Sequence, residues 1–236
     1  MNKEEKEKYF GKAIPQIIHD IRNPLNIIIG FSSILQIDES INEEVRSYIK
    51  NIILSGMHIE QLLSNIDYFM MDTLDMPIES VFIKKEYEIF IKQNFDIIND
   101  KQIIINNNLK DDTILKLPQG IFTRILDNFF QFSLKGMKSV TNRQINIDLF
   151  INDKALLFYY HDTSTPIYIE SDYFSFDEIL KGKRSLAPMF IEKLIKEYNG
   201  TIHYLYGKKW AAELDVIQSN IKTQHGFKII IPIQSL

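Results

Sequence analysis

Residues 19–25 combine three side chains that could carry phosphoryl chemistry on one helical face. They read His-Asp-Ile-Arg-Asn-Pro-Leu and lie inside a segment whose apolar residues recur every three or four positions. The imidazole of His19 has a carboxylate beside it at Asp20 and an amide one helical turn later at Asn23. An imidazole that accepts a phosphoryl group needs an adjacent acid or base, and an amide can hold an attacking water. His19, Asp20 and Asn23 are therefore the candidate catalytic residues.

Two long helices are expected to position these groups. The first apolar series is Ile14, Ile17, Ile21, Pro24, Ile28, Phe31 and Leu35. After a break at residues 38–40, the second series is Val45, Ile49, Ile52, Gly56, Ile59, Leu63, Ile66 and Met70. These heptad-like stripes predict a helical hairpin with left-handed packing. If Ile14 occupies heptad position a, His19 falls at position f on the solvent face, and Pro24 should bend the helix just beyond it.

The apolar stripes are too wide for two helices to bury against each other. Ile18, Leu25 and Leu62 extend them beyond a two-stranded seam. We therefore expect a homodimer in which two hairpins form a four-helix bundle. The alternative is that the second domain covers the additional apolar face.

Composition narrows the class of protein. The 236 residues are 45% hydrophobic and 25% charged with a net charge of -4, which argues against a nucleic-acid platform. Cysteine is absent, so disulfide and thiolate chemistry are excluded. The charged start is unlike a signal peptide, and no apolar run is long enough to span a membrane. We expect a cytoplasmic protein with no membrane association, and no metal-ligand spacing among the histidines.

Met76-Pro77 is the expected domain boundary, which gives a helical hairpin over 1–75 and a second domain over 76–236. Beyond it the pattern predicts an α/β sandwich, so the overall class is α+β. The expected helices cover 83–98, 118–139 and 185–198. The expected strands cover 102–106, 113–117, 145–151, 156–160, 201–206, 213–218 and 227–233.

The His-Asp-Ile-Arg-Asn-Pro-Leu motif on a helical hairpin resembles the dimerisation and phosphoacceptor domain of bacterial two-component histidine kinases. The elements that follow resemble their GHKL-type ATP-binding domain, so the resemblance covers nearly the whole chain. It implies that His19 is the phosphorylated residue and that Asp20 assists the transfer. It also implies that Asn23 supports dephosphorylation of a partner.

The nucleotide motifs depart from the family pattern. In the run that matches the asparagine-rich box, Asn128 and Lys135 are kept, but Phe132 replaces the magnesium-binding asparagine. An aromatic ring cannot coordinate a hard cation. Asp162 could still read an adenine amino group, yet the glycines expected after it are missing, as are those expected at 183–188. Such glycines let the backbone approach phosphate groups. Asn128, Lys135 and Asp162 therefore outline a vestigial nucleotide site, with ATP and Mg²⁺ binding expected to be lost.

These features favour a histidine phosphotransfer protein of a two-component phosphorelay, without ATP-dependent kinase activity. Receiver domains of response regulators would be the partners, His19 would exchange phosphoryl with their aspartates, and the receiver would supply the magnesium. One alternative is a divergent active histidine kinase that still binds ATP. Another is a non-catalytic pseudokinase, or a phosphatase, that regulates a response regulator.

Overall fold

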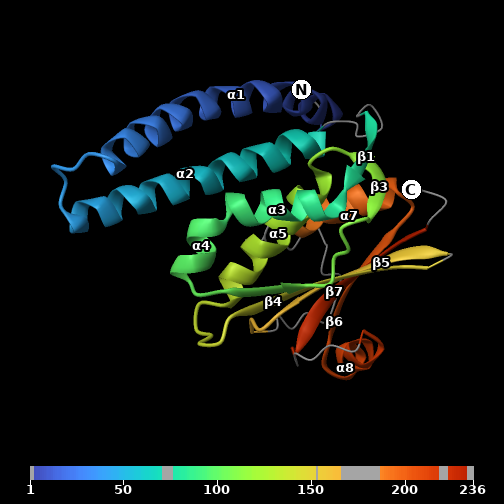
Figure 1. Cartoon of the computed structure of the whole chain (residues 1–236). Coiled ribbons are helices and arrows are strands. Elements are labelled where there is room, and N and C mark those ends of the chain that lie inside the picture. Colours follow the sequence, from blue (N-terminus) through green and yellow to red (C-terminus); the bar gives the residue numbers. More distant parts are fainter. Residues whose placement is uncertain (1–2, 71–76, 153, 166–186, 218–222, 233–236) are drawn as a thin grey trace. The chain divides into compact units, whose positions relative to one another are not determined.

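The computed structural model describes residues 3–70, 77–152, 154–165, 187–217 and 223–232. The chain divides into two compact units, Met1–Asp72 and Thr73–Leu236 (Figure 1). Met76, at the expected boundary, lies outside the described residues. Two N-terminal helices are followed by a mixed α/β unit, so the predicted α+β class is confirmed.

The first unit is an antiparallel hairpin of α1 (Lys3–Gln36) and α2 (Glu43–Met70) (Figure 1). Helix α1 continues through Pro24. Asn42 caps α2, because its side-chain oxygen accepts the N–H of Val45 at 2.9 Å. Arg46 then ties the turn together by donating to the carbonyl oxygens of Asp38 at 3.0 Å and Ile41 at 3.2 Å. The sequence break at 38–40 is therefore a turn that α2 itself holds closed.

On α1, the contact with α2 uses residues beside the expected stripe. Ile18 and Leu25 of α1 are buried against Leu63 of α2, and Ile14 and Ile66 of the stripe pack against this cluster. A Cβ on Gly56 would lie 2.6 Å from a side-chain carbon of Ile29, so the helices approach closely there. Most of the expected stripe stays exposed; its members with large exposed side chains are Ile17, Ile21, Ile28, Phe31, Leu35, Val45, Ile52, Ile59 and Met70. Two residues that seemed only to widen the stripe, Ile18 and Leu25, thus form the buried α1 side of the seam.

The second unit contains two sheets. The smaller sheet pairs β1 (Ile78–Phe82) with β3 (Ile114–Pro118) in antiparallel fashion. The larger sheet has the order β2-β4-β5-β7-β6, in which only β2 and β4 run parallel. Its strands are β2 (Ile104–Asn107), β4 (Gln144–Ile151), β5 (Ala155–Asp162), β6 (Thr201–Tyr206) and β7 (His225–Pro232). The helices are α3 (Ile83–Gln93), α4 (Phe95–Asp100), α5 (Ile121–Gly136), α7 (Ala187–Glu197) and α8 (Gly207–Val216).

Aromatic side chains join α5 to the larger sheet. Phe129 stacks on Tyr160 of β5 with ring centroids 4.8 Å apart and packs against Phe227 of β7 at 4.6 Å. All three rings are fully buried. Aromatic pairs of this kind add to the free energy gained by burying their area. The face of α5 on which the nucleotide motif lies is therefore also a main contributor to the core.

Helix α8 corrects the expected strand over 213–218, most of which is helical. Trp210, Leu214 and Ile217 follow helical spacing, and they pack on the face of β5 that carries Tyr159. In Figure 1, α8 lies across the sheet from α5 and α7. The expected helix over 83–98 is also divided, because α3 ends before Asn94 and α4 starts after it.

Gly226→Ala is expected to destabilise the second unit by about 1–3 kcal/mol, because extra carbon atoms in a packed core force neighbours to move. A Cβ at this position would lie 2.4 Å from the ring of Trp210, which is fully buried. Urea unfolding followed by circular dichroism measures the loss. Trp210→Phe in the same chain should recover part of it, since it shortens the ring. Equal stability of Gly226→Ala and the wild type would contradict the packing described.

Candidate functional site

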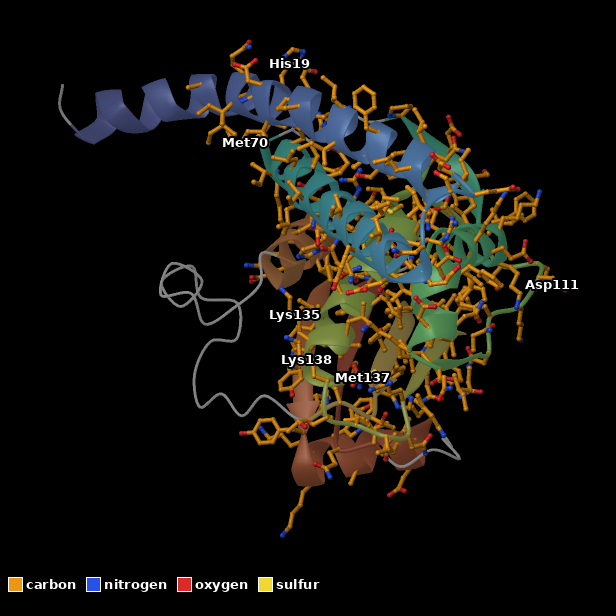
Figure 2. The ribbon with its side chains drawn as sticks, turned by 90° about the vertical axis from the view of Figure 1, so that its left-hand side faces the viewer. His19, Met70, Asp111, Lys135, Met137 and Lys138 are labelled. Atoms are coloured by element: carbon orange, nitrogen blue, oxygen red, sulfur yellow. The ribbon has the colours of Figure 1, made fainter. Side chains whose placement is uncertain are left out.

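The imidazole of His19 is exposed on the outer side of α1 (Figure 2) and is joined to the neighbouring carboxylate. Its Nδ1 lies 3.2 Å from Oδ1 of Asp20. Because an ionised carboxylate only accepts hydrogen bonds, a neutral imidazole in this pair carries its proton on Nδ1. The lone pair of Nε2 is then available on the solvent side. The sequence-predicted pair of His19 and Asp20 is therefore brought together in a form suited to nucleophilic attack through Nε2.

Asn23 lies one helical turn after His19 and its side chain is exposed. Residues four apart on a helix share a face, so its amide points to the same solvent region as the imidazole. An amide there can donate a hydrogen bond to a phosphoryl oxygen or hold a water. All three residues predicted in the first unit thus lie on one accessible surface.

Arg22 fastens this part of α1 to α2, a role that the sequence did not reveal. Its Nε donates to both carboxylate oxygens of Glu60, at 2.9 and 3.1 Å, and its guanidinium also donates to Asp67 at 2.9 Å. Hydrogen bonds to Asp67 and the charge of Glu60 raise the pKa of Arg22 above its usual value. The guanidinium of Arg22 therefore stays charged and neutralises part of the negative charge of Glu60 and Asp67. Arg22 therefore fixes the rotation of α1 next to His19.

In the second unit, the residue at the expected metal-binding position belongs to the core. Phe132 is buried, and its ring meets that of Phe227 edge to face at 5.4 Å. Asn128 is also buried, and its side-chain amide donates to the carbonyl oxygen of Arg124 at 2.9 Å. Neither side chain is presented to solvent from α5.

The carboxylate of Asp162 is buried and accepts hydrogen bonds from neighbouring residues of the second unit. Its carboxylate is 1% exposed, and it accepts the N–H of Ser164 at 2.7 Å and the hydroxyl of Ser133. Tyr160 contacts the same hydroxyl at 2.9 Å, and Nε2 of His225 lies 3.7 Å from the carboxylate. A Cβ on Gly136 would lie 2.7 Å from Cβ of Ser164, so the end of α5 closes on the chain after β5.

Lys135 is exposed and lies with Lys138 near the end of α5 (Figure 2). In the described part of the chain, Asn128 and Asp162 are buried and Lys135 is exposed. These three side chains do not converge on one open site. Of the segment 183–188, where the last glycine box is expected, residues 183–186 lie outside the described residues.

Asp127, the neighbour of Asn128, is a titratable group that the sequence pattern did not single out. Burial raises the pKa of its carboxyl from 3.8 to about 6, against a hydrogen bond from Asn94 and the charge of Arg124, which lower it. The side-chain amide of Asn94 donates to Asp127 Oδ1 at 2.7 Å. The folded unit therefore holds a proton on this group at pH values where the unfolded chain does not.

The free energy of unfolding of the wild type is expected to fall as the pH rises from about 4 to about 7. Asp127→Asn is expected to abolish this fall. A raised carboxyl pKa means that the folded state binds more protons in this range, so the free energy of unfolding falls as pH rises. An increase from 3.8 to about 6 corresponds to roughly 3 kcal/mol. Urea unfolding at pH 4.5 and 7.5 compares the wild type with Asp127→Asn, with exposed Asp96→Asn as control. An unchanged slope with pH in Asp127→Asn would refute this role.

Both units are similar to known proteins. Residues 11–74 match the His Kinase A (phospho-acceptor) domain. The fold is similar to that in the crystal structure of full-length ShkA in complex with AMPPNP, with a TM-score of 0.60 over 93% of this chain. The chain has the fold of a histidine kinase core. Sequence identity to ShkA is 16%, and the match covers 45% of that chain.

Two further histidine kinases are similar to this chain. ThkA, solved in complex with the response regulator protein TrrA, matches with a TM-score of 0.56 and 16% identity over 97% of this chain and 63% of that one. The cell-division control histidine kinase PdhS of Brucella anthropi is 30% identical over 152 residues, which is 58% of this chain. The chain spans 14 to 16% of the length of the curated relatives it matches. These similarities support a histidine-kinase fold for both units.

The first unit includes two helices of more than 25 residues. None of the helices in the described part of the chain has the length and apolar character of a membrane-spanning segment.

Proposed function

We propose that this chain is a histidine phosphotransfer protein that exchanges phosphoryl groups between His19 and receiver-domain aspartates. The observation that carries the proposal is a contrast between the two units. The first exposes His19 with its Nδ1 hydrogen-bonded to Asp20, whereas the second buries Asn128 and Asp162, two of the three residues expected to hold a nucleotide. Phosphoryl transfer from ATP depends almost entirely on metal ions and on positioning. The described residues of the second unit do not fit that task.

In the proposed exchange, the Nε2 lone pair of neutral His19 attacks the phosphorus of an aspartyl phosphate on the partner. The nitrogen–phosphorus bond forms as the bond from phosphorus to the carboxylate oxygen breaks, and the electron pair leaves with the carboxylate. Asp20 accepts the hydrogen bond from Nδ1 and stabilises the positive charge that develops on the ring. The proton on Nδ1 later passes to water. Magnesium would be supplied by the receiver.

A receiver domain is the partner that this chemistry requires. ThkA, which shares the fold, was solved with a response regulator. The direct test incubates the protein with a panel of receivers that carry ³²P-labelled aspartyl phosphate, in the absence of ATP. Label should move to this protein from at least one receiver. Failure of every receiver to label it would overturn the proposal.

The competing assignment, a divergent kinase, has a separate test. Calorimetric titration with Mg-ATP should show no binding in the micromolar range, and [γ-³²P]ATP should leave His19 unlabelled. Micromolar binding together with label on His19 would establish the divergent kinase instead.

We also propose that two copies pair through the first unit to form a four-helix bundle. The exposed stripe has heptad spacing on both helices, and its members include Ile21 and Ile28 of α1 and Val45 and Ile52 of α2, each more than 40% exposed. Apolar side chains at a and d positions are the ones that helices bury between copies. The buried residues of the seam within the hairpin, Ile18, Leu25 and Leu63, are not among these exposed members. A second hairpin would therefore cover the open stripe.

Phe31→Glu is expected to weaken this pairing at least tenfold, because a charge would be buried at the centre of the bundle. Phe31 is 65% exposed in the single chain, so the hairpin itself should tolerate the change. Sedimentation equilibrium measures the dissociation constant. Ser33→Glu, on an exposed position of the same helix, is the control and should stay dimeric. A wild-type protein that sediments as a monomer would refute the pairing.

A further inference from the structure

Gln16 lies one helical turn before Asp20 and donates a second hydrogen bond to the carboxylate that His19 uses. Its Nε2 is 2.8 Å from Oδ1 of Asp20, the same oxygen that lies 3.2 Å from Nδ1 of His19. The three side chains thus form a chain along the surface of α1, from amide to carboxylate to imidazole. Gln16, the first of these three side chains, lies before the His-Asp-Ile-Arg-Asn-Pro-Leu segment.

We infer that Gln16 is a positioning residue that holds Asp20 in the orientation that keeps the His19 proton on Nδ1. This inference rests on the proposed function only for its consequence in transfer, since the tautomer itself is a property of the free protein. An aspartate on an exposed helix turn is free to rotate. A donor four residues earlier selects the rotamer in which Oδ1 faces both partners.

The second hydrogen bond also fixes what Asp20 does. With Oδ1 facing both Gln16 and His19, the carboxylate accepts the hydrogen bond from Nδ1 and leaves the proton on the ring. Its role is to orient the ring, which leaves the lone pair on Nε2 as the nucleophile.

The neighbouring charges leave this arrangement undisturbed. Arg22, two residues after Asp20, directs its guanidinium to Glu60 and Asp67 on α2. A cation on Asp20 would compete with Gln16 for the carboxylate. With Arg22 occupied on the other helix, the carboxylate of Asp20 is held by neutral donors.

Nitrogen-15 NMR of the histidine-labelled protein tests the inference. The ring signals of His19 are assigned by their absence in His19→Ala, and the shifts of Nδ1 and Nε2 report which nitrogen carries the proton. The wild type should show mainly the Nδ1-protonated form. Gln16→Ala should lower the ratio of this form to the other by about 1.4-fold to 2.3-fold, the size expected for a surface hydrogen bond between residues four apart.

Two variants separate positioning from a general effect on the helix. Gln16→Lys keeps a donor and should restore the wild-type ratio, whereas Asn26→Ala, an exposed amide on the same helix, should leave it unchanged. In transfer from a phosphorylated receiver, Gln16→Ala should lower kcat by a similar factor with KM unchanged. An unaltered tautomer ratio in Gln16→Ala overturns the inference. Absence of transfer with an altered ratio overturns the proposed function and leaves the role of Gln16 established.

Discussion

His19→Ala is expected to abolish phosphoryl acceptance from a phosphorylated receiver, a loss of at least a thousandfold. Alanine has no nucleophilic side chain, and His161, His203 and His225 lie on strands and not on a helix face. Asn23→Ala should keep acceptance within about tenfold, because the amide positions groups without forming the covalent bond. The measurement is the rate at which ³²P moves from the receiver to the protein.

The same variants distinguish transfer from phosphatase action. If the protein acts mainly by placing water at the receiver's aspartyl phosphate, His19→Ala would retain loss of label to inorganic phosphate, and Asn23→Ala would lose it. His203→Ala, an exposed histidine on β6, is the control for removing an imidazole and should behave as the wild type. Undiminished labelling of His19→Ala would rule out His19 as the acceptor.

The periodicity of the first unit predicted its two helices and the exposed position of His19, because both depend on local spacing. It could not predict which apolar row forms the seam. Ile18 and Ile21 are the same residue type, yet one is buried and the other is 44% exposed. The burial of Ile18 depends on Leu63 and its neighbours across the hairpin, which the local spacing of α1 does not encode.

The second unit shows the same limit for polar residues. The replacement of the expected metal ligand by Phe132 was evident in the sequence. The enclosure of Asp162 was not, because its partner Ser133 comes from α5, on another element of the fold. Helix α8 was missed for a related reason, since the strand expected over 213–218 was assigned from a short segment. Its helical character follows from Trp210 and Ile217 packing on Tyr159.

Glu86→Ala is expected to destabilise the second unit by about 3–5 kcal/mol, since several buried donors lose their acceptor together and each costs about 1–3 kcal/mol. Glu86 is a buried carboxylate of α3. It accepts the N–H of Gly120 at 3.1 Å, the N–H of Thr123 at 3.1 Å and the hydroxyl of Thr123 at 2.7 Å. Helix α5 has no side-chain cap of its own, because its N-cap residue is Gly120. Glu86 supplies that cap from another helix, and its negative charge lies at the positive end of the α5 dipole.

Fluorescence of Trp210, the single tryptophan and fully buried in the second unit, reports urea unfolding of that unit in the whole protein. Glu86→Gln should lose less than Glu86→Ala, because the amide keeps one carbonyl acceptor but gives up the charge. Glu88→Ala, an exposed position on the same helix, should change the midpoint little. If Glu86→Ala unfolds at the same urea concentration as Glu88→Ala, the cap contributes nothing to stability. A large loss would mean that α5, which holds both Phe132 and Ser133, is fixed from its first turn by α3.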